Sequence, residues 1–210
     1  MRKRPGGHPR VEMTISEVRP RTIDRALALL ETALDGQPEG SQPAGVWRTD
    51  AGALNQIIAI WIGQDDAEVH RTSSGALSAL DEMCVGLRRV DLTPAPFSPA
   101  LLPRRLGAFY EFRFYTFKPG SFAGIMDRWQ GTIGRRLEYS PLLGVWCAEE
   151  VSSDELVHAW AYKDANEWQS VRQEVIAKGI WPPPATLESS QLLLRQTSVI
   201  ALPTSFSRIS

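Results

Sequence analysis

The sequence predicts an α+β protein made of two tandem ferredoxin-like units, each with the element order β-α-β-β-α-β. Three observations predict this class. A Gly-Val-Trp motif occurs twice at a fixed offset, apolar stripes of helical spacing occur twice at the same offset, and short apolar strands stand between them. Each unit is therefore expected to form an antiparallel sheet with two helices on one face.

The duplication is the observation on which the rest depends. Gly45-Val46-Trp47 recurs 99 residues later as Gly144-Val145-Trp146, and Trp61 recurs as Trp160. Ten of the 58 ungapped positions from 11 to 68 are identical to their partners at this offset. Residue class also agrees where class matters for folding, so we interpret the chain as one unit that was copied and then diverged.

The first helix of each copy is predicted from an apolar stripe. Apolar residues step by three or four positions in the first copy, and their partners in the second copy are all apolar. A proline precedes each stripe, at Pro20 and Pro119, where a missing backbone N–H does little harm. The two stripes are Ile23, Leu27, Leu30 and Leu34, and Phe122, Met126, Trp129 and Ile133.

The second helix of each copy carries a start signal. Asp65 and Asp164 can each accept a hydrogen bond from the backbone N–H three residues on, where Glu68 and Glu167 stand. This is the spacing of a capping box with Asp as the cap, and it predicts a helix beginning at each aspartate.

Strands and linkers complete the domain organisation. Strands are expected from residue 46, at 55–62 and near 86–92, and again at 142–148, 155–162 and 191–202. We expect a disordered basic leader at 1–10, a first unit at 11–97, a linker at 98–109 and a second unit at 110–207. The second copy holds about ten extra residues near Trp181-Pro182-Pro183-Pro184, either a polyproline docking tract or a helix stop.

Composition excludes several classes of function. A formal net charge of −1 over 210 residues argues against nucleic-acid binding, and no apolar run is long enough to span a membrane. Two cysteines and three histidines are too few for a structural zinc framework, so no metal is expected. The leader lacks the apolar stretch of a secretory signal, and a mitochondrial transit peptide is the alternative to a cytoplasmic location.

The second half resembles a known family. Tyr139-Ser140-Pro141-Leu142-Leu143-Gly144-Val145-Trp146, followed by Leu156-Val157-His158-Ala159-Trp160-Ala161-Tyr162, resembles the NIPSNAP family, and residues 110–120 look like its first strand and turn. The first half matches only in outline, as a degenerate copy. The resemblance implies a dimeric α+β barrel, in which two ferredoxin-like sheets pack face to face. Animal members are linked to mitochondria and protein interactions, bacterial members mostly lack an assigned activity, and no agreed catalytic residues carry over.

Strand alternation in the second copy predicts a site. The small residues Val157, Ala159 and Ala161 share one face of their strand, and we expect this face to lie under the helices. The opposite, polar and aromatic face would then meet the other sheet and form a ligand-binding cavity. With Trp146, the predicted ligand-binding residues are Glu111, Arg113, Tyr115, His158, Trp160 and Tyr162.

Function stays open between binding and catalysis. The first hypothesis is a barrel without an assigned reaction that binds a small aromatic or acidic ligand, or a protein partner. The alternative is a cofactor-independent monooxygenase or isomerase acting on a small aromatic substrate, with His158 as the candidate catalytic residue. No cofactor is expected, and haem with His158 as axial ligand is a third alternative. A buried Glu111–Arg113 ion pair that serves folding alone is the structural alternative for these charges.

Assembly follows from the duplication. A single ferredoxin-like sheet would leave one apolar face in water, and a second copy in the same chain can cover it. We expect an intramolecular pseudo-dimer. Exchange of copies between two chains and further homodimerisation remain alternatives.

Overall fold

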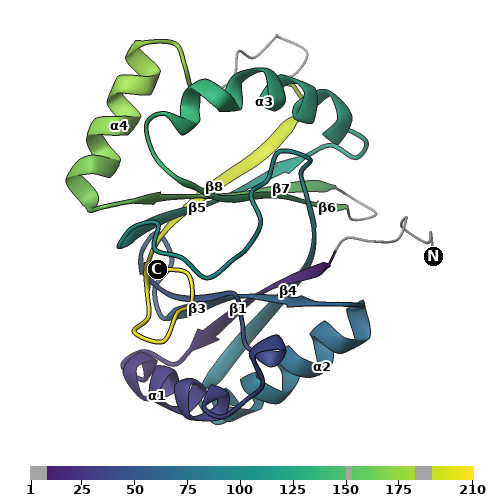
Figure 1. The fold of residues 1–210 in the computed structure, drawn as a ribbon, viewed down its shortest axis with the longest axis vertical. Helices are drawn as coiled ribbons and strands as arrows, with labels where there is room; N and C mark the ends of the chain where they lie inside the picture. Colours follow the sequence, from purple (N-terminus) through teal and green to yellow (C-terminus); the bar gives the residue numbers. More distant parts are fainter. Residues whose placement is uncertain (1–8, 150–152, 183–190) are drawn as a thin grey trace.

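The strands of the protein close into one antiparallel barrel with helices on its outside (Figure 1). A computed structural model describes residues 9–149, 153–182 and 191–210. Within these residues the strand order around the barrel is β1-β3-β2-β8-β5-β7-β6-β4. The predicted leader lies largely outside the described residues, and the first strand already begins at Arg10.

Both halves have the predicted order β-α-β-β-α-β. The first unit consists of β1 (Arg10–Val18), α1 (Ile23–Leu34), β2 (Gly45–Ala51), β3 (Gln56–Gly63), α2 (Asp66–Leu77) and β4 (Cys84–Pro94). The second consists of β5 (Phe109–Phe117), α3 (Phe122–Leu137), β6 (Leu142–Glu149), β7 (Asp154–Tyr162), α4 (Ala165–Ala177) and β8 (Leu193–Pro203). The fold class predicted from the repeat is confirmed.

The two units join edge to edge within one chain. Each unit forms a four-stranded sheet with β1 or β5 near its centre, and the sheets meet through β2 with β8 and β4 with β6. The second seam is short, with only Thr93 opposite Cys147 and Pro94 opposite Trp146. In Figure 1 the two sheets lie face to face between two outer helix layers, which confirms the intramolecular pseudo-dimer.

The capping boxes are confirmed in both second helices. Asp65 accepts from the backbone N–H of Glu68 at 2.8 Å, and Asp164 accepts from that of Glu167 at 2.9 Å. Each glutamate reaches back, Glu68 to the N–H of Gln64 and Glu167 to that of Lys163. Two backbone N–H groups at each helix start are thereby satisfied.

The Gly-Val-Trp motif places a large indole between the sheets. Trp47 and Trp146 are fully buried in the core that the sheets share, and each ring folds back over the glycine two residues earlier on the same face. A Cβ at Gly45 or Gly144 would overlap that ring. The glycine is therefore required by close approach, which explains why the motif survives in both copies.

The predicted assignment of the two sheet faces is wrong. Val157, Ala159 and Ala161 lie in the core between the sheets, and the polar, aromatic face of β5 and β7 lies under α3 and α4. Phe112 and Trp146 from the neighbouring strands β5 and β6, and Trp47 from β2 of the other unit, enter the space between the sheets, so β7 must be small there. Small size on one strand is not by itself a sign of a helix contact.

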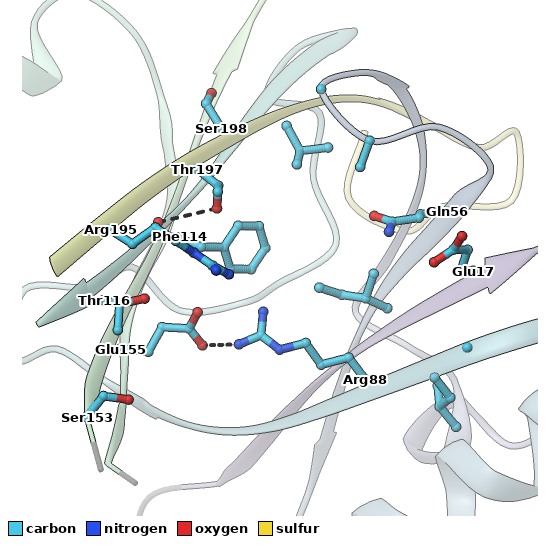
Figure 2. A pocket seen from close by; sticks show the side chains of 16 residues that line it. Glu17, Gln56, Arg88, Phe114, Thr116, Ser153, Glu155, Arg195, Thr197 and Ser198 are labelled. Atoms are coloured by element: carbon cyan, nitrogen blue, oxygen red, sulfur yellow. Dashed lines mark hydrogen bonds and ion pairs between the residues drawn. The ribbon is translucent and has the colours of Figure 1, made fainter.

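The two ends of the barrel differ. Where β5 begins, Leu101 and Leu106 of the connection and Ile209 near the C-terminus pack on the shared core, and Arg104 bridges to Ile209. At the opposite end a cavity of about 860 Å³ opens between the sheets (Figure 2). Among the described residues, no helix is long and apolar enough to cross a membrane.

Candidate functional site

Most of the predicted site residues come together, but under the helices instead of between the sheets. Five of them line a cavity of about 170 Å³ bounded by the second sheet, α3, α4 and the segment after α4: Glu111, Arg113, Tyr115, Trp160 and Tyr162. His158 is adjacent but does not line the cavity. Trp146 lies on the opposite face of the sheet and is not part of this site.

Seven lining residues were not predicted as site residues, and three of these bring a guanidinium group or an indole ring to the cavity. Arg136 comes from the last turn of α3, Arg172 from α4, and Trp181 from the segment that follows α4. Trp181 precedes the proline run, of which Pro183 and Pro184 lie outside the described residues. The alternation of the strands gave no information about which helix residues would face the sheet.

Glu111 is at the centre of a buried polar network. Its carboxylate accepts hydrogen bonds from Arg172 Nη1 and, at 2.8 Å, from Ser198 Oγ of β8. Arg113 Nε lies 3.7 Å from the same oxygen, which is an ion pair without a hydrogen bond. A buried carboxylate needs such partners because its desolvation is costly.

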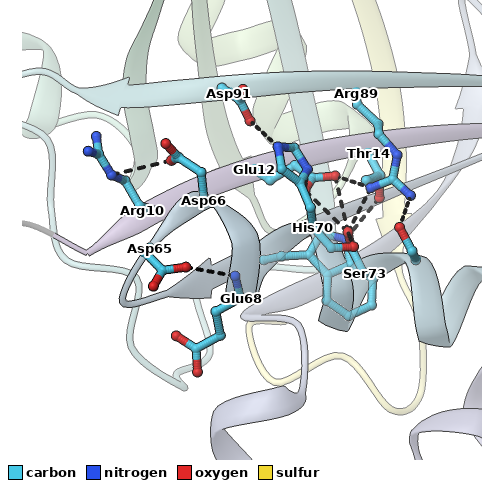
Figure 3. Close-up of polar contacts among 12 residues, drawn as sticks. Arg10, Glu12, Thr14, Asp65, Asp66, Glu68, His70, Ser73, Arg89 and Asp91 are labelled. Carbon is cyan, nitrogen blue, oxygen red and sulfur yellow. Dashed lines mark hydrogen bonds and ion pairs between the residues drawn. The ribbon is translucent and has the colours of Figure 1, made fainter. Parts of the chain in front are cut away.

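The first unit contains the same network with two residues exchanged (Figure 3). Glu12, the counterpart of Glu111, accepts from Arg89 of β4 and from Ser73 of α2 at 3.2 Å. Ser73 stands 99 residues before Arg172, so the helix position carries serine in one unit and arginine in the other.

Strand register establishes the second exchange. Arg89 is opposite Thr14 in the first sheet, and Ser198 is opposite Arg113, the counterpart of Thr14, in the second. Arg89 and Ser198 are therefore equivalent positions. In each unit one arginine and one serine donate hydrogen bonds to the buried glutamate, and the two residues have exchanged places. This network stabilises the fold in both halves and does not distinguish them.

The first-unit network also brings possible metal ligands together. Glu12, His70 and Asp91 place ligand atoms within 4.8 Å of one another. His70 Nδ1 lies 2.7 Å from Glu12 and its Nε2 lies 3.5 Å from Asp91, so both ring nitrogens already face carboxylates. Arg89 adds a positive charge on Glu12, which disfavours a cation there. These contacts describe a hydrogen-bonded network of the first unit.

Apart from the network that both units share, four residues of this face occur only in the second unit. Arg113, Tyr115, His158 and Tyr162 replace Thr14, Ser16, Ala59 and Gly63 of the first unit, respectively. Trp61 Nε1 donates to Thr14 Oγ1 at 2.9 Å, whereas Trp160 Nε1 donates to His158 Nδ1 at 2.9 Å. In the second unit the imidazole of His158 thus accepts the hydrogen bond that Thr14 accepts in the first. Position 113 therefore need not carry a hydroxyl group, and it is an arginine.

His158 is enclosed and uncharged. It is fully buried, and the rings of Trp129 and Tyr115 pack on it with centroids 4.7 and 5.0 Å away. Burial holds the pKa of His158 well below its usual 6.5, and Arg113 and Arg136 lower it further. The neutral ring accepts from Trp160, so His158 positions that indole.

Haem does not fit at His158. An axial ligand needs open space over the free nitrogen for the macrocycle and its iron. Trp129 and Tyr115 close the space around this ring, and the neighbouring cavity of about 170 Å³ is lined by other residues.

Arg136 and Arg113 bring charge to the cavity wall. Arg136 donates to Ser140 Oγ at 2.8 Å and to Tyr162 Oη at 3.0 Å, and its guanidinium lies 4.0 Å from the centroid of Trp160. Burial lowers the pKa of Arg136, although a guanidinium stays protonated at neutral pH. The Arg113 guanidinium lies 5.1 Å from the centroid of Tyr115.

Both arginines have an unused donor. The Nε atoms of Arg113 and Arg136 are buried and have no hydrogen-bond acceptor within the described part of the chain. Burial also raises the pKa of Tyr115 and of Tyr162, so both phenols keep their protons at neutral pH. Three guanidinium groups and two phenols thus surround one carboxylate, and the cavity favours an anion.

Comparison with known proteins shows a family to which the second half is similar and a fold that the whole chain shares. The NIPSNAP family model matches residues 110–208. A protein named NipSnap homolog from Dictyostelium discoideum is 22% identical over 152 residues, which cover 70% of this chain and 68% of that protein.

Two solved structures are similar over nearly the full length. The crystal structure of a putative monooxygenase from Lactobacillus acidophilus NCFM has a TM-score of 0.64 at 8% identity and covers 94% of each chain. An anthrone oxidase-like protein has a TM-score of 0.65 at 8% identity and covers 96% of this chain and 94% of its own. At such identities the likeness shows only the fold, a barrel built from two units.

Proposed function

We propose, from the premise that the second half of the chain belongs to the NIPSNAP family, that this half binds a small aromatic carboxylate between its sheet and helices α3 and α4. The first unit serves mainly as the structural partner that closes the barrel. The observation that supports this proposal is the pair of buried, unused Nε–H donors of Arg113 and Arg136 beside one cavity. Buried donors in folded proteins normally have acceptors, and a carboxylate supplies them.

The size and walls of the cavity define the ligand further. An apolar cavity of about 150 Å³ is known to hold one benzene ring, and this cavity measures about 170 Å³. Trp160 and Trp181 stand 5.7 Å apart between ring centroids and offer aromatic surfaces to a flat molecule. A single ring with one carboxylate satisfies both the charge and the volume.

Binding is better supported than catalysis. A base that removes a proton must reach the substrate, and His158 is separated from the cavity. Glu111 lines the cavity, but Arg172 and Ser198 occupy one of its carboxylate oxygens. The two tyrosines are protonated at neutral pH because burial raises the pKa of each. The monooxygenase or isomerase alternative therefore lacks a group in position to begin the reaction.

Isothermal titration with benzoate tests the proposal, with benzamide as the neutral isostere. We expect benzoate to bind and benzamide to bind at least about tenfold more weakly, because a charge-assisted hydrogen bond contributes about 1.5–3 kcal/mol. Arg113→Gln and Arg136→Gln should each weaken benzoate binding by about tenfold or more. Arg71→Gln, an exposed arginine on α2 of the first unit, is the matched control and should bind normally.

Two results would overturn the proposal. Equal affinity for benzoate and benzamide would show that the guanidinium groups do not recognise the ligand. An equal loss in Arg71→Gln would show a nonspecific charge effect. Thermal unfolding of each variant without ligand identifies any loss that comes from misfolding.

A further inference from the structure

At the open end of the barrel, six of the eight strands carry a polar inward-facing residue, although the barrel interior is apolar. Inward-facing residues alternate along each strand, and on β1 they run Val11, Met13, Ile15 and then Glu17. The same change occurs two residues beyond Ile58 on β3, Val90 on β4, Phe114 on β5, Val157 on β7 and Val199 on β8. The polar residues reached there are Gln56, Arg88, Thr116, Glu155 and Thr197.

Strand register brings the outermost of these polar residues to one level, and Arg88 and Thr197 lie one step deeper, opposite Ile15 and Phe114. Glu17 is opposite Gln56 on one side and Gly86 on the other. Across the barrel, Thr116 is opposite Glu155 and Arg195. One wall thus comes from the first unit and the other from the second, and we call the space between them the barrel mouth (Figure 2).

The barrel mouth has space because Gly86, on its wall, has no side chain that could occupy it. A Cβ at Gly86 would meet only Glu17, at 3.7 Å, so this wall has room. The cavity of about 860 Å³ lies within the range of about 300–1,000 Å³ that is typical of small-molecule pockets. Its base is apolar, with Ile15, Phe114 and Val199 among its lining residues.

Four charged residues line the barrel mouth. Two of them form an ion pair with each other, and the other two do not. Arg88 of β4 and Glu155 of β7 form an ion pair that connects the two units, and the Arg88 guanidinium lies 5.6 Å from the Phe114 ring centroid. Glu17 and Arg195 belong to opposite walls. Neither forms a salt bridge within the residues that the structure describes.

We propose that the barrel mouth is a second binding site, and that it takes a small zwitterion with an apolar side group, such as a free aliphatic amino acid. Glu17, with the Gln56 amide beside it, receives the ammonium group, and Arg195 receives the carboxylate. The apolar side group lies toward Phe114 and Ile15. Opposite charges on opposite walls select a molecule that carries both, and the apolar base selects its side chain.

Three leucine derivatives test this assignment by NMR titration or calorimetry. We expect L-leucine to bind, and N-acetyl-L-leucine and L-leucine amide, which each lack one charge, to bind at least about tenfold more weakly. Glu17→Gln should remove the preference for L-leucine over N-acetyl-L-leucine. Arg195→Gln should remove its preference over the amide.

Two further variants separate the two sites. Thr116→Trp places an indole ring across the mouth, at the level of Glu17 and Gln56, and should abolish leucine binding while leaving benzoate binding intact. Arg113→Gln, in the cavity under α3 and α4, should leave leucine binding unchanged. No binding of L-leucine to the wild type, or equal binding of all three derivatives, would overturn the proposal. Loss of leucine binding in Arg113→Gln would also overturn it, because the two cavities would then not be separate sites.

Discussion

His158 makes the stability of the protein depend on pH in a defined direction. Its folded-state pKa is well below 6.5, whereas in the unfolded chain it is near 6.5. Below pH 6.5 the unfolded chain therefore binds a proton that the folded protein excludes. The free energy of unfolding should fall as the pH drops through this region, by up to about 1.4 kcal/mol per pH unit, and His158 should contribute no slope above it.

Urea unfolding of the wild type and of His158→Gln between about pH 7 and pH 5 tests this prediction. The glutamine oxygen can still accept from Trp160 Nε1, but it does not titrate. All other titrating groups are common to both proteins and cancel in the difference. The wild type should lose more stability than the variant as the pH falls. Parallel pH profiles would contradict an enclosed, neutral imidazole.

The exchanged positions of arginine and serine around Glu111 lead to a second prediction at the residue scale. Arg172→Ser removes the arginine of Glu111 and should lower the free energy of unfolding by about 1–3 kcal/mol, since a buried carboxylate loses its partner. Adding Ser198→Arg restores an arginine at the position that Arg89 holds in the first unit. The double variant should recover at least half of the loss.

Chemical denaturation of the four proteins of this cycle gives the coupling free energy. The reverse exchange, Ser73→Arg with Arg89→Ser, is the matched test in the first unit and should show coupling of the same sign. Additive effects in both units would contradict equivalence of the two networks.

At the scale of the elements, the Gly-Val-Trp motif predicts a contrast between two glycines. Gly144→Ala places a methyl group into the indole of Trp146 and should cost about 1–3 kcal/mol. Gly131→Ala on the exposed side of α3 meets nothing within 4 Å and should stabilise by about 0.4–1 kcal/mol, because alanine favours helix. Thermal or urea unfolding measures both changes. Destabilisation of similar size in both variants would contradict this reason for the motif.

The sequence predicted the helices and strands more accurately than it predicted which face of each sheet meets the helices. Constant offsets and capping boxes identified both units, their order and the starts of α2 and α4, since these signals are local. Which face of β7 meets the helices depends on what neighbouring strands insert between the sheets, and that is a long-range property. The recurring Gly-x-Trp spacing carried this information, because a glycine that makes room for an indole indicates the more crowded face.

The site was predicted in part for the same reason. Strand alternation grouped Glu111, Arg113 and Tyr115 correctly, because residues two apart share a face wherever that face lies. Arg136 and Arg172 come from helices whose rotation the strand pattern does not fix. The counterpart of Arg172 is Ser73, so conservation between the copies also gave no signal there.

At the scale of the whole molecule, the barrel makes the two units thermodynamically dependent. The central core contains residues of both, with Met13 and Trp47 from the first unit beside Phe112 and Trp146 from the second. Separation would expose this entire layer to water, and apolar burial contributes about 25 cal/mol per Å². The strand seams are too short to act as the main connection, since β4 and β6 share two paired positions and β2 and β8 share four. The units are therefore held together by the layer between the sheets.

Because the two units share this layer, we expect a substitution that destabilises one unit to lower the stability of the other unit by the same free energy. Leu30 is buried under α1, in a cluster that contains no residue of the second unit's sheet, so Leu30→Ala should cost about 2–5 kcal/mol by leaving a cavity there. If the barrel unfolds as one cooperative body, amide hydrogen exchange of β5 and β7 should accelerate by the same free energy, although neither strand touches the altered site. Glu31→Gln on the same helix is exposed and should leave exchange in both units unchanged. Second-unit amides that keep their wild-type protection in Leu30→Ala would instead mean that β5 to β8 stay folded without the first unit, and the barrel would then be two domains in contact.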